Sequence, residues 1–145
     1  MKPYQVVLDT NVLVAALRSR RGASHKLLML LGQGLYEPHL SVPLVLEYED
    51  VLRRLDERLA LGDEDIAAVL DYICAVAHHQ PIFYLWRPFL KDPKDDMVLE
   101  LAVAAQCPII ITFNARDFRG SDQFGVRTLR PQEFLAMIGA EHEHD

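Results

Sequence analysis

The stretch Gln5-Val6-Val7-Leu8-Asp9 is a short apolar run that ends on an acid. A continuous apolar run of this kind predicts a short buried strand. Acids seldom end a buried apolar strand without a partner. We therefore expect the Asp9 carboxylate to project from the carboxyl edge of a sheet, toward another group.

Similar apolar runs follow along the chain, separated by segments with helical spacing. Strands are predicted at 5–8, 35–40, 82–84 and 109–111. Helices are predicted at 11–17, 23–31, 41–59, 66–77, 95–106 and 131–138. This alternation is typical of a parallel sheet covered on both faces. The sequence therefore predicts an α/β fold with a central parallel sheet flanked by helices on both faces. In such sheets, ligands bind outside the carboxyl ends of the strands.

Length and composition favour one globular unit. Half of the 145 residues are hydrophobic, which suits one domain with one core. We expect a domain over residues 1–138 and a disordered acidic tail over 139–145. No apolar run approaches the length of a membrane span, and the first run is too short for a signal-peptide core, so a cytoplasmic location without a membrane partner is expected. Cys74 and Cys107 are too few for a disulfide scaffold or a zinc cluster.

The formal net charge of −6 argues at first against a nucleic-acid partner. An acidic metal site would account for part of this charge, because bound cations offset it. The basic residues are also grouped along the chain. One group is Arg18, Arg20 and Arg21, and the other is Arg116, Arg119, Arg127 and Arg130. For any single arginine, a solvated surface charge is an equally good interpretation.

Carboxylates from four segments are expected at the same edge of the sheet. Thr112, Asn114 and Asp117 follow the strand-like run at 109–111, as Asp9 follows the first strand. Acids also open the helix predicted at 95–106, where the helix dipole favours an anion. These acids are Asp92, Asp95 and Asp96. Glu47 lies at the border of the apolar stripe of its helix, one turn before Val51, and should point inward.

Each of these acids also has a purely structural interpretation. Asp95 and Asp96 could be helix caps, Glu47 could be a solvated glutamate, and Asp117 could bond its own turn. Taken together, however, converging carboxylates repel each other unless they are protonated or bound to a cation. Oxygen ligands without paired cysteines or histidines suit Mg²⁺ or Mn²⁺. Such a site suits phosphodiester hydrolysis with either one ion or two.

Other phosphate-handling α/β proteins fit the sequence less well. A dehalogenase-like phosphatase needs a second aspartate two positions after the first, where this chain has Asn11. A phospho-receiver domain needs an acidic pair at the end of the first strand and a later lysine, and neither is evident. The sequence also lacks a glycine-rich phosphate loop of the Walker or Rossmann kind.

Four motifs, in this order, resemble the PIN domain. They are Val7-Leu8-Asp9-Thr10-Asn11-Val12, Leu46-Glu47-Tyr48, Asp92-Pro93-Lys94-Asp95-Asp96 leading to Ala102, and Thr112-Phe113-Asn114-Ala115-Arg116-Asp117-Phe118. The resemblance spans almost the whole chain and is closest to the PIN-family toxins of toxin–antitoxin systems, including VapC-type ribonucleases. It implies a Mg²⁺- or Mn²⁺-dependent endoribonuclease, a homodimer, and a cognate antitoxin protein as partner.

The resemblance also implies roles for individual residues. The family acids fall on Asp9, Glu47, Asp96 and Asp117. Asp95 is the alternative to Asp96 if the register shifts by one. Asp9 and Asp96 would contact metal, with the other two acids completing the pocket. Supporting residues would be Asn11, Thr112 and Asn114, and phosphate contacts would be Arg18, Arg116 and Arg119.

One departure from the family pattern affects the expected activity. Many members have Thr-x-Asp where this chain has Thr112-Phe113-Asn114. This leaves open the number of metal ions and whether Asn114 weakens activity. The alternative function is therefore a catalytically weak PIN-like module that binds RNA or a protein.

Overall fold

The computed structural model describes residues 2–55, 61–82 and 89–139 of the chain. Its strands are β1 (Tyr4–Leu8), β2 (Tyr36–Leu40), β3 (His78–His79), β4 (Ile109–Ile111) and β5 (Arg127–Leu129). Its helices are α1 (Thr10–Arg18), α2 (Ala23–Met29), α3 (Val42–Arg54), α5 (Asp63–Val76), α6 (Pro93–Ala104) and α7 (Pro131–Met137). Two short 3₁₀ helices, η1 (Ala115–Phe118) and η2 (Ser121–Phe124), connect β4 to β5.

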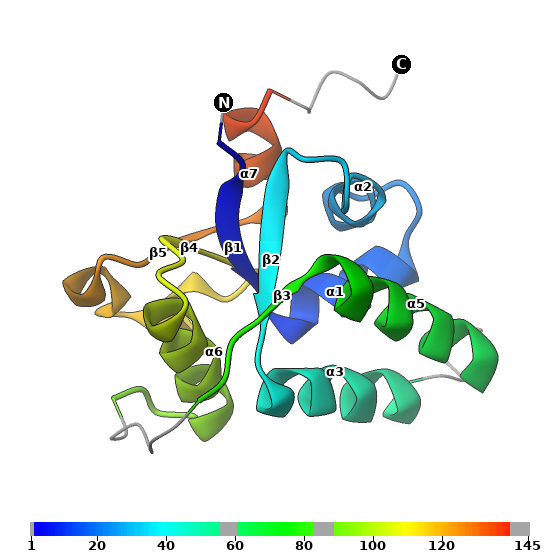
Figure 1. Cartoon of the computed structure of the whole chain (residues 1–145), viewed down its shortest axis with the longest axis horizontal. Coiled ribbons are helices and arrows are strands. Elements are labelled where there is room, and N and C mark those ends of the chain that lie inside the picture. Colours follow the sequence, from blue (N-terminus) through cyan, green and yellow to red (C-terminus); the bar gives the residue numbers. More distant parts are fainter. Residues whose placement is uncertain (1, 56–60, 83–88, 140–145) are drawn as a thin grey trace.

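The five strands form one parallel sheet in the order β3-β2-β1-β4-β5 (Figure 1). Strand β1 lies at its centre, with Leu8 opposite Ile111 of β4. The ladder continues for one residue past the strand, because the Asp9 N–H donates to the Ile111 carbonyl at 2.9 Å. This register places Asp9 beside the residues that follow β4. The α/β fold predicted from the sequence is confirmed.

Helices cover both faces of the sheet. Helices α7, α2, α1, α3 and α5 contact one another in a continuous series, whereas α6 packs on β1, β2 and β4. The central strands β1 and β4 are therefore buried from both sides, and Val6, Val7 and Ile110 are fully buried. This explains why Val6–Leu8 of β1 and Ile109–Ile111 of β4 are continuous apolar runs, whereas β2 alternates between buried and half-buried residues.

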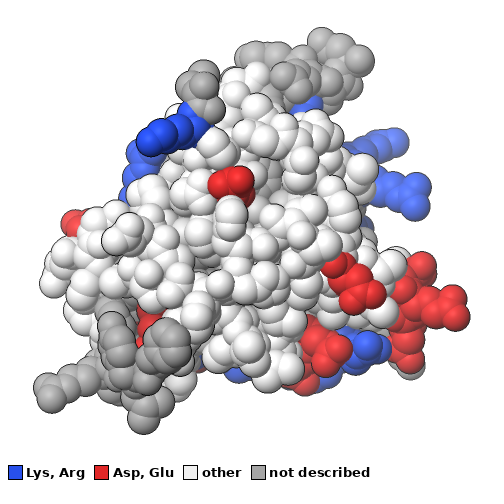
Figure 2. Space-filling model, viewed as in Figure 1, with Lys and Arg blue, Asp and Glu red and all other residues white. Residues whose placement is uncertain are grey.

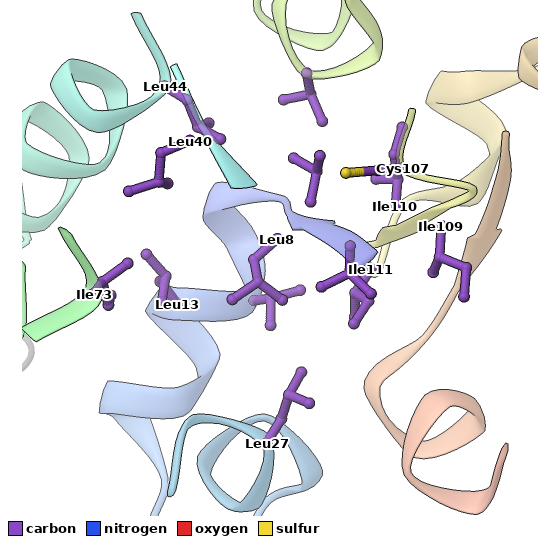
Figure 3. Packing of buried hydrophobic residues seen from close by; sticks show 14 of the residues in the cluster. Leu8, Leu13, Leu27, Leu40, Leu44, Ile73, Cys107, Ile109, Ile110 and Ile111 are labelled. Atoms are coloured by element: carbon purple, nitrogen blue, oxygen red, sulfur yellow. The ribbon is translucent and has the colours of Figure 1, made fainter. Parts of the chain in front are cut away.

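The core joins β1, β4 and the helices that cover them. Figure 3 shows Leu8 and Ile111 from the two central strands among Leu13 of α1 and Leu27 of α2. Aromatic side chains extend this core, since Tyr36 of β2 packs edge-on against Phe134 of α7. The carboxyl ends of β1 and β4 are thereby held rigidly side by side.

The predicted elements differ from the structure mainly at their ends. Helix α3 ends at Arg54, and residues 56–60 of its predicted extension lie outside the described residues. Helix α5 begins at Asp63 rather than at Ile66 because Gly62 serves as its N-cap. None of the described helices is both long and apolar enough to cross a membrane.

Strands β3 and β5 were not predicted from the sequence. One predicted strand, at 82–84, has no counterpart among the described residues. Strand β3 has two residues and β5 has three, which is too short for a periodic pattern. Of the strand predicted at 82–84, Ile82 lies outside any strand, and positions 83 and 84 are outside the described residues. The acidic tail lies outside them from residue 140 onward.

Candidate active site

Asp9 is held at the point where β1 turns into α1. It is the N-cap of α1, and its Oδ1 accepts a hydrogen bond from the Thr10 N–H at 2.9 Å. Its Oδ2 accepts one from the Thr112 hydroxyl at 2.8 Å. The buried Tyr48 hydroxyl donates to the preceding Leu8 carbonyl, which ties α3 to the end of β1. Two hydrogen bonds thus fix the carboxylate itself, and a third fixes the backbone just before it.

The surroundings of Asp9 disfavour its negative charge. Burial raises the pKa of Asp9, and the nearby Asp117 and Glu47 carboxylates raise it further. The hydrogen bonds from Thr112 and Thr10 act in the opposite direction but do not cancel the effect. A cation at this position would relieve the burial and repulsion that act against the charged form.

Thr112 and Asn11 join the end of β4 to the start of α1. The Thr112 hydroxyl oxygen accepts from the Asn114 N–H at 3.0 Å and from the Asn11 amide at 3.5 Å. The Asn11 side-chain oxygen Oδ1 accepts from the Phe113 N–H at 3.4 Å. These contacts orient the Thr112 hydroxyl toward Asp9, so Asn11 and Thr112 support the carboxylate without themselves being charged.

Asp95 and Asp96 are neighbours in the first turn of α6, but they point to different places. Asp95 lines the same pocket as Asp9, and burial raises its pKa to about 7, with the nearby carboxylates adding to the rise, Asp9 foremost among them. Asp96 is buried, and its Oδ1 accepts from the Phe89 and Leu90 N–H groups at 3.2 and 2.8 Å. The structure therefore places Asp95, the alternative to Asp96, in the pocket. Asp96 instead binds the backbone of the segment before α6.

Glu47 reaches the pocket from α3. Its side chain is 12% exposed, consistent with its expected position at the border of the apolar stripe. The Lys94 ammonium lies 3.6 Å from its Oε1. Lys94 was not predicted as a site residue. Its position directly before Asp95, in the first turn of α6, could have indicated that it lies near the pocket. It provides a positive charge inside an otherwise acidic group.

Asp117 and Asn114 reach the pocket from the segment after β4. Both are exposed residues that line it, and the Asp117 N–H donates to the Asn114 carbonyl at 3.0 Å, closing the first turn of η1. Asp117 is close enough to raise the pKa of both Asp9 and Asp95. This turn therefore holds a fourth carboxylate at the same edge of the sheet.

The pocket has a volume of about 210 Å³. Its lining residues are Asp9, Thr10, Asn11, Glu47, Asp92, Lys94, Asp95, Met97, Val98, Asn114 and Asp117. Among the described residues, no three His, Cys, Asp or Glu side chains are already placed to ligate one ion. A bound ion would therefore require the carboxylates to turn toward it.

None of the three predicted phosphate contacts is among the residues that line the pocket. Arg18 lines a neighbouring groove of about 620 Å³ that shares Thr10 and Asn11 with the pocket. Arg116 and Arg119 are exposed, in η1 and directly after it. The roles of these arginines stay predictions, and Lys94, which does line the pocket, was not predicted.

Comparison with known proteins identifies the family of the chain. A family model described as PIN domain matches residues 5–116, which include the end of β1, α3, the first turn of α6 and β4. The chain belongs to the PIN domain family. The match covers the segments that carry Asp9, Glu47 and Asp95, and it ends one residue before Asp117, the remaining carboxylate of the acidic pocket of this PIN domain.

A solved structure shares the fold of this PIN domain. It is a chain of the crystal structure of VapBC2 from Rickettsia felis bound to a DNA fragment from their promoter. The two chains superpose with a TM-score of 0.58 at 14% identity, over 87% of this chain and 98% of that one. No curated protein matches the sequence. The resemblance to the PIN family that the sequence motifs indicated is thus confirmed.

Proposed function

We propose that this PIN domain is a Mg²⁺- or Mn²⁺-dependent endoribonuclease that hydrolyses phosphodiester bonds of RNA at its acidic pocket. The observation that carries the proposal is the convergence of Asp9, Glu47, Asp95 and Asp117 from four separate segments. Stability alone would not favour this arrangement, because like charges that share a site oppose each other's ionisation. Such groups are typical of functional sites.

The donor set fits a hard divalent cation. Carboxylate and amide oxygens are the ligands that Mg²⁺ and Mn²⁺ prefer. Asp9 and Asp95 would be the direct ligands, because both carry a raised pKa that a cation would lower. Glu47 and Asp117 would complete the site as ligands or through bound water. The geometry does not decide between one ion and two.

The surrounding residues would prepare the site for hydrolysis. A bound divalent ion supplies stabilisation for the charge that grows on the phosphate oxygens and activates water. Thr112 and Thr10 keep the Asp9 carboxylate in one orientation through their hydrogen bonds. Lys94 lies close enough to neutralise Glu47 when no substrate is bound, and it would be free to contact a phosphate when Glu47 turns inward. Asn114 adds a neutral polar group at the rim.

We further propose that the chain is the toxin of a toxin–antitoxin pair. The support is its family and its fold likeness to a chain of a VapBC2 structure, together with the motif resemblance to PIN-family toxins. On this proposal the chain would form a homodimer, bind a cognate antitoxin protein and act on RNA in the cytoplasm.

Cleavage of structured RNA tests the nuclease proposal. We expect cleavage by the purified chain with Mn²⁺ or Mg²⁺ and none with EDTA. Asp9→Asn and Asp95→Asn should each lower the rate at least about 100-fold, since even residues that orient ligands cost 10–100-fold when changed. Asp96→Asn is the matched control, because its carboxylate faces backbone amides and not the pocket. Circular dichroism verifies that each variant is folded.

Other outcomes would redirect the proposal. Undiminished cleavage by folded Asp9→Asn and Asp95→Asn variants would reject the acidic pocket as the active site. Binding of RNA without metal and without cleavage by the wild-type chain would favour the alternative, a PIN-like module that binds RNA. Loss of cleavage in Asp96→Asn alone would return the ligand role to Asp96.

A further inference from the structure

A second pocket, lined by basic residues, lies between α2 and α7. It has a volume of about 500 Å³ and is lined by Arg20, Arg21, Gly22, Ala23, Lys26, Gln132 and Leu135. Arg20 and Arg21 are exposed in the connection after α1, Lys26 comes from α2, and Gln132 comes from α7. None of these lining residues is acidic. In a chain of net charge −6, this pocket concentrates positive charge.

Lys26 is the residue whose surroundings indicate a missing anionic ligand. Its Nζ atom is buried and has no hydrogen-bond partner among the described residues. Neither Arg20 nor Arg21 takes part in an ion pair within the described part of the chain. A desolvated ammonium without a partner is costly. An anion in the pocket would remove that cost and pair all three cations at once.

We propose that this basic pocket binds a phosphate group. Two guanidinium groups can each make paired hydrogen bonds to phosphate oxygens, and the Lys26 ammonium, which is buried without a ligand, would turn toward the phosphate and add a third positive charge. The Gln132 amide lines the same pocket and can donate to a further oxygen. A phosphate, with more charge and more acceptor oxygens than a carboxylate, matches this number of donors.

The position of the pocket indicates the backbone of an RNA strand as the source of that phosphate. The groove beside the acidic pocket follows α1 from Thr10 to Ser19, and Arg20 comes next in the chain. The nine residues of α1 span about 13 Å at 1.5 Å per residue. A strand seated in the acidic pocket could therefore run along α1, past Arg18, and reach the basic pocket within a few nucleotides. This part of the inference rests on the proposed ribonuclease function.

Binding measurements in EDTA test the inference without requiring cleavage. The affinity of a short single-stranded RNA is measured by fluorescence anisotropy across a range of salt concentrations. The variants are Arg20→Gln/Arg21→Gln and Lys26→Met, which removes the ammonium but keeps the length of the side chain. The matched control is Arg54→Gln, because that guanidinium is already paired with Asp50 at 2.8 Å.

We expect each test variant to bind RNA roughly tenfold more weakly, as the loss of a hydrogen bond to a charged group implies. The slope of log affinity against log salt should fall by about 0.7 for each phosphate contact removed. Arg54→Gln should change neither quantity. Unchanged RNA affinity in both test variants would overturn the RNA path, whatever the result of the cleavage assay.

A second measurement distinguishes the two sources of phosphate. Inorganic phosphate should raise the melting temperature of the wild-type chain above that in chloride at equal ionic strength, and this gain should vanish in Lys26→Met. In phosphate-free buffer Lys26→Met should be at least as stable as the wild type, because it removes an unpaired buried charge. Protection by phosphate with unchanged RNA affinity would support a free phosphate ligand and reject the strand. Absence of protection in the wild type, with unchanged RNA affinity, would overturn the phosphate pocket itself.

Discussion

Helix α1 has an acidic pocket at its beginning and a basic pocket beyond its end. Asp9 caps its first turn, Arg18 lies in its last turn, and Arg20 and Arg21 follow. Each sign of charge lies at the helix end where the dipole favours it. On the face seen in Figure 2, most charged side chains lie toward the edges, around a broad and largely uncharged surface. The net charge of −6 for the whole chain therefore does not indicate the local charge of either pocket.

The two pockets differ in how they are assembled. The acidic pocket draws its carboxylates from four segments that the sheet and α6 bring together, and it contains a cation of its own in Lys94. The basic pocket draws its three cations from Arg20 to Lys26, a single short stretch, and α7 closes it with neutral residues. The first therefore depends on the whole fold, and the second on local sequence and one helix contact. Each calls for a ligand of the opposite charge.

Kinetics should separate the two pockets most strongly. Asp9→Asn should lower kcat for RNA cleavage at least about 100-fold, because it removes a group needed at the reacting bond. Asparagine caps a helix as well as aspartate does, so α1 should remain folded. Arg20→Gln/Arg21→Gln should raise KM roughly tenfold and leave kcat unchanged, as expected for loss of uniform binding. A fall in kcat for the arginine variant would mean that the two pockets are not separate in function.

Stability should separate the two adjacent aspartates of α6. Asp96→Asn weakens the acceptor of two backbone N–H groups, and we expect a loss of about 1–3 kcal/mol in the free energy of unfolding. Asp95→Asn should not destabilise the metal-free chain, because it removes a repelled charge. Urea unfolding of both variants in EDTA measures the difference. Equal losses would show that Asp95 also holds the backbone.

The pH dependence of the metal-free chain should show the smallest effect. Burial raises the pKa of Asp95 from its ordinary value of 3.8 to about 7 in the folded chain, so the folded state binds the proton more tightly. This contribution to stability is complete below about pH 4 and is lost as the pH rises to about 7. The carboxyl is partly exposed and screened, so we expect less than about 1 kcal/mol. Thermal melts of the wild type and Asp95→Asn in EDTA, from pH 4 to pH 8, should diverge in favour of the variant, and parallel curves would contradict the shift.

The sequence predicted the parts of the fold and site that depend on strong periodicity. Asp9 could be placed because it follows an apolar strand, and Glu47 because it borders an apolar stripe. The choice between Asp95 and Asp96 could not be made, since residues one apart in the first turn of a helix differ by a rotation that depends on how the helix docks. The hydrogen bonds from the Phe89 and Leu90 N–H groups to Asp96 depend on the folded structure and leave no pattern in the sequence.

The basic pocket could not be predicted for a related reason. Arg20 and Arg21 form a cluster that is evident in the sequence. Lys26 follows five residues after Arg21, inside helix α2. Nothing in the local pattern indicates that α7, more than a hundred residues later, packs on α2. Tertiary packing, which joins segments remote in the chain, decides this site.

Binding of Mn²⁺ tests most directly whether the four carboxylates form a metal site. Isothermal titration of the wild type, Asp95→Asn and Asp96→Asn, with the fold of each verified by circular dichroism, is sufficient. We predict that the wild type and Asp96→Asn bind Mn²⁺ with similar affinity and that Asp95→Asn binds at least tenfold more weakly. Undiminished binding by Asp95→Asn, or no binding by the folded wild type, would contradict a cation site at the carboxyl edge of the sheet.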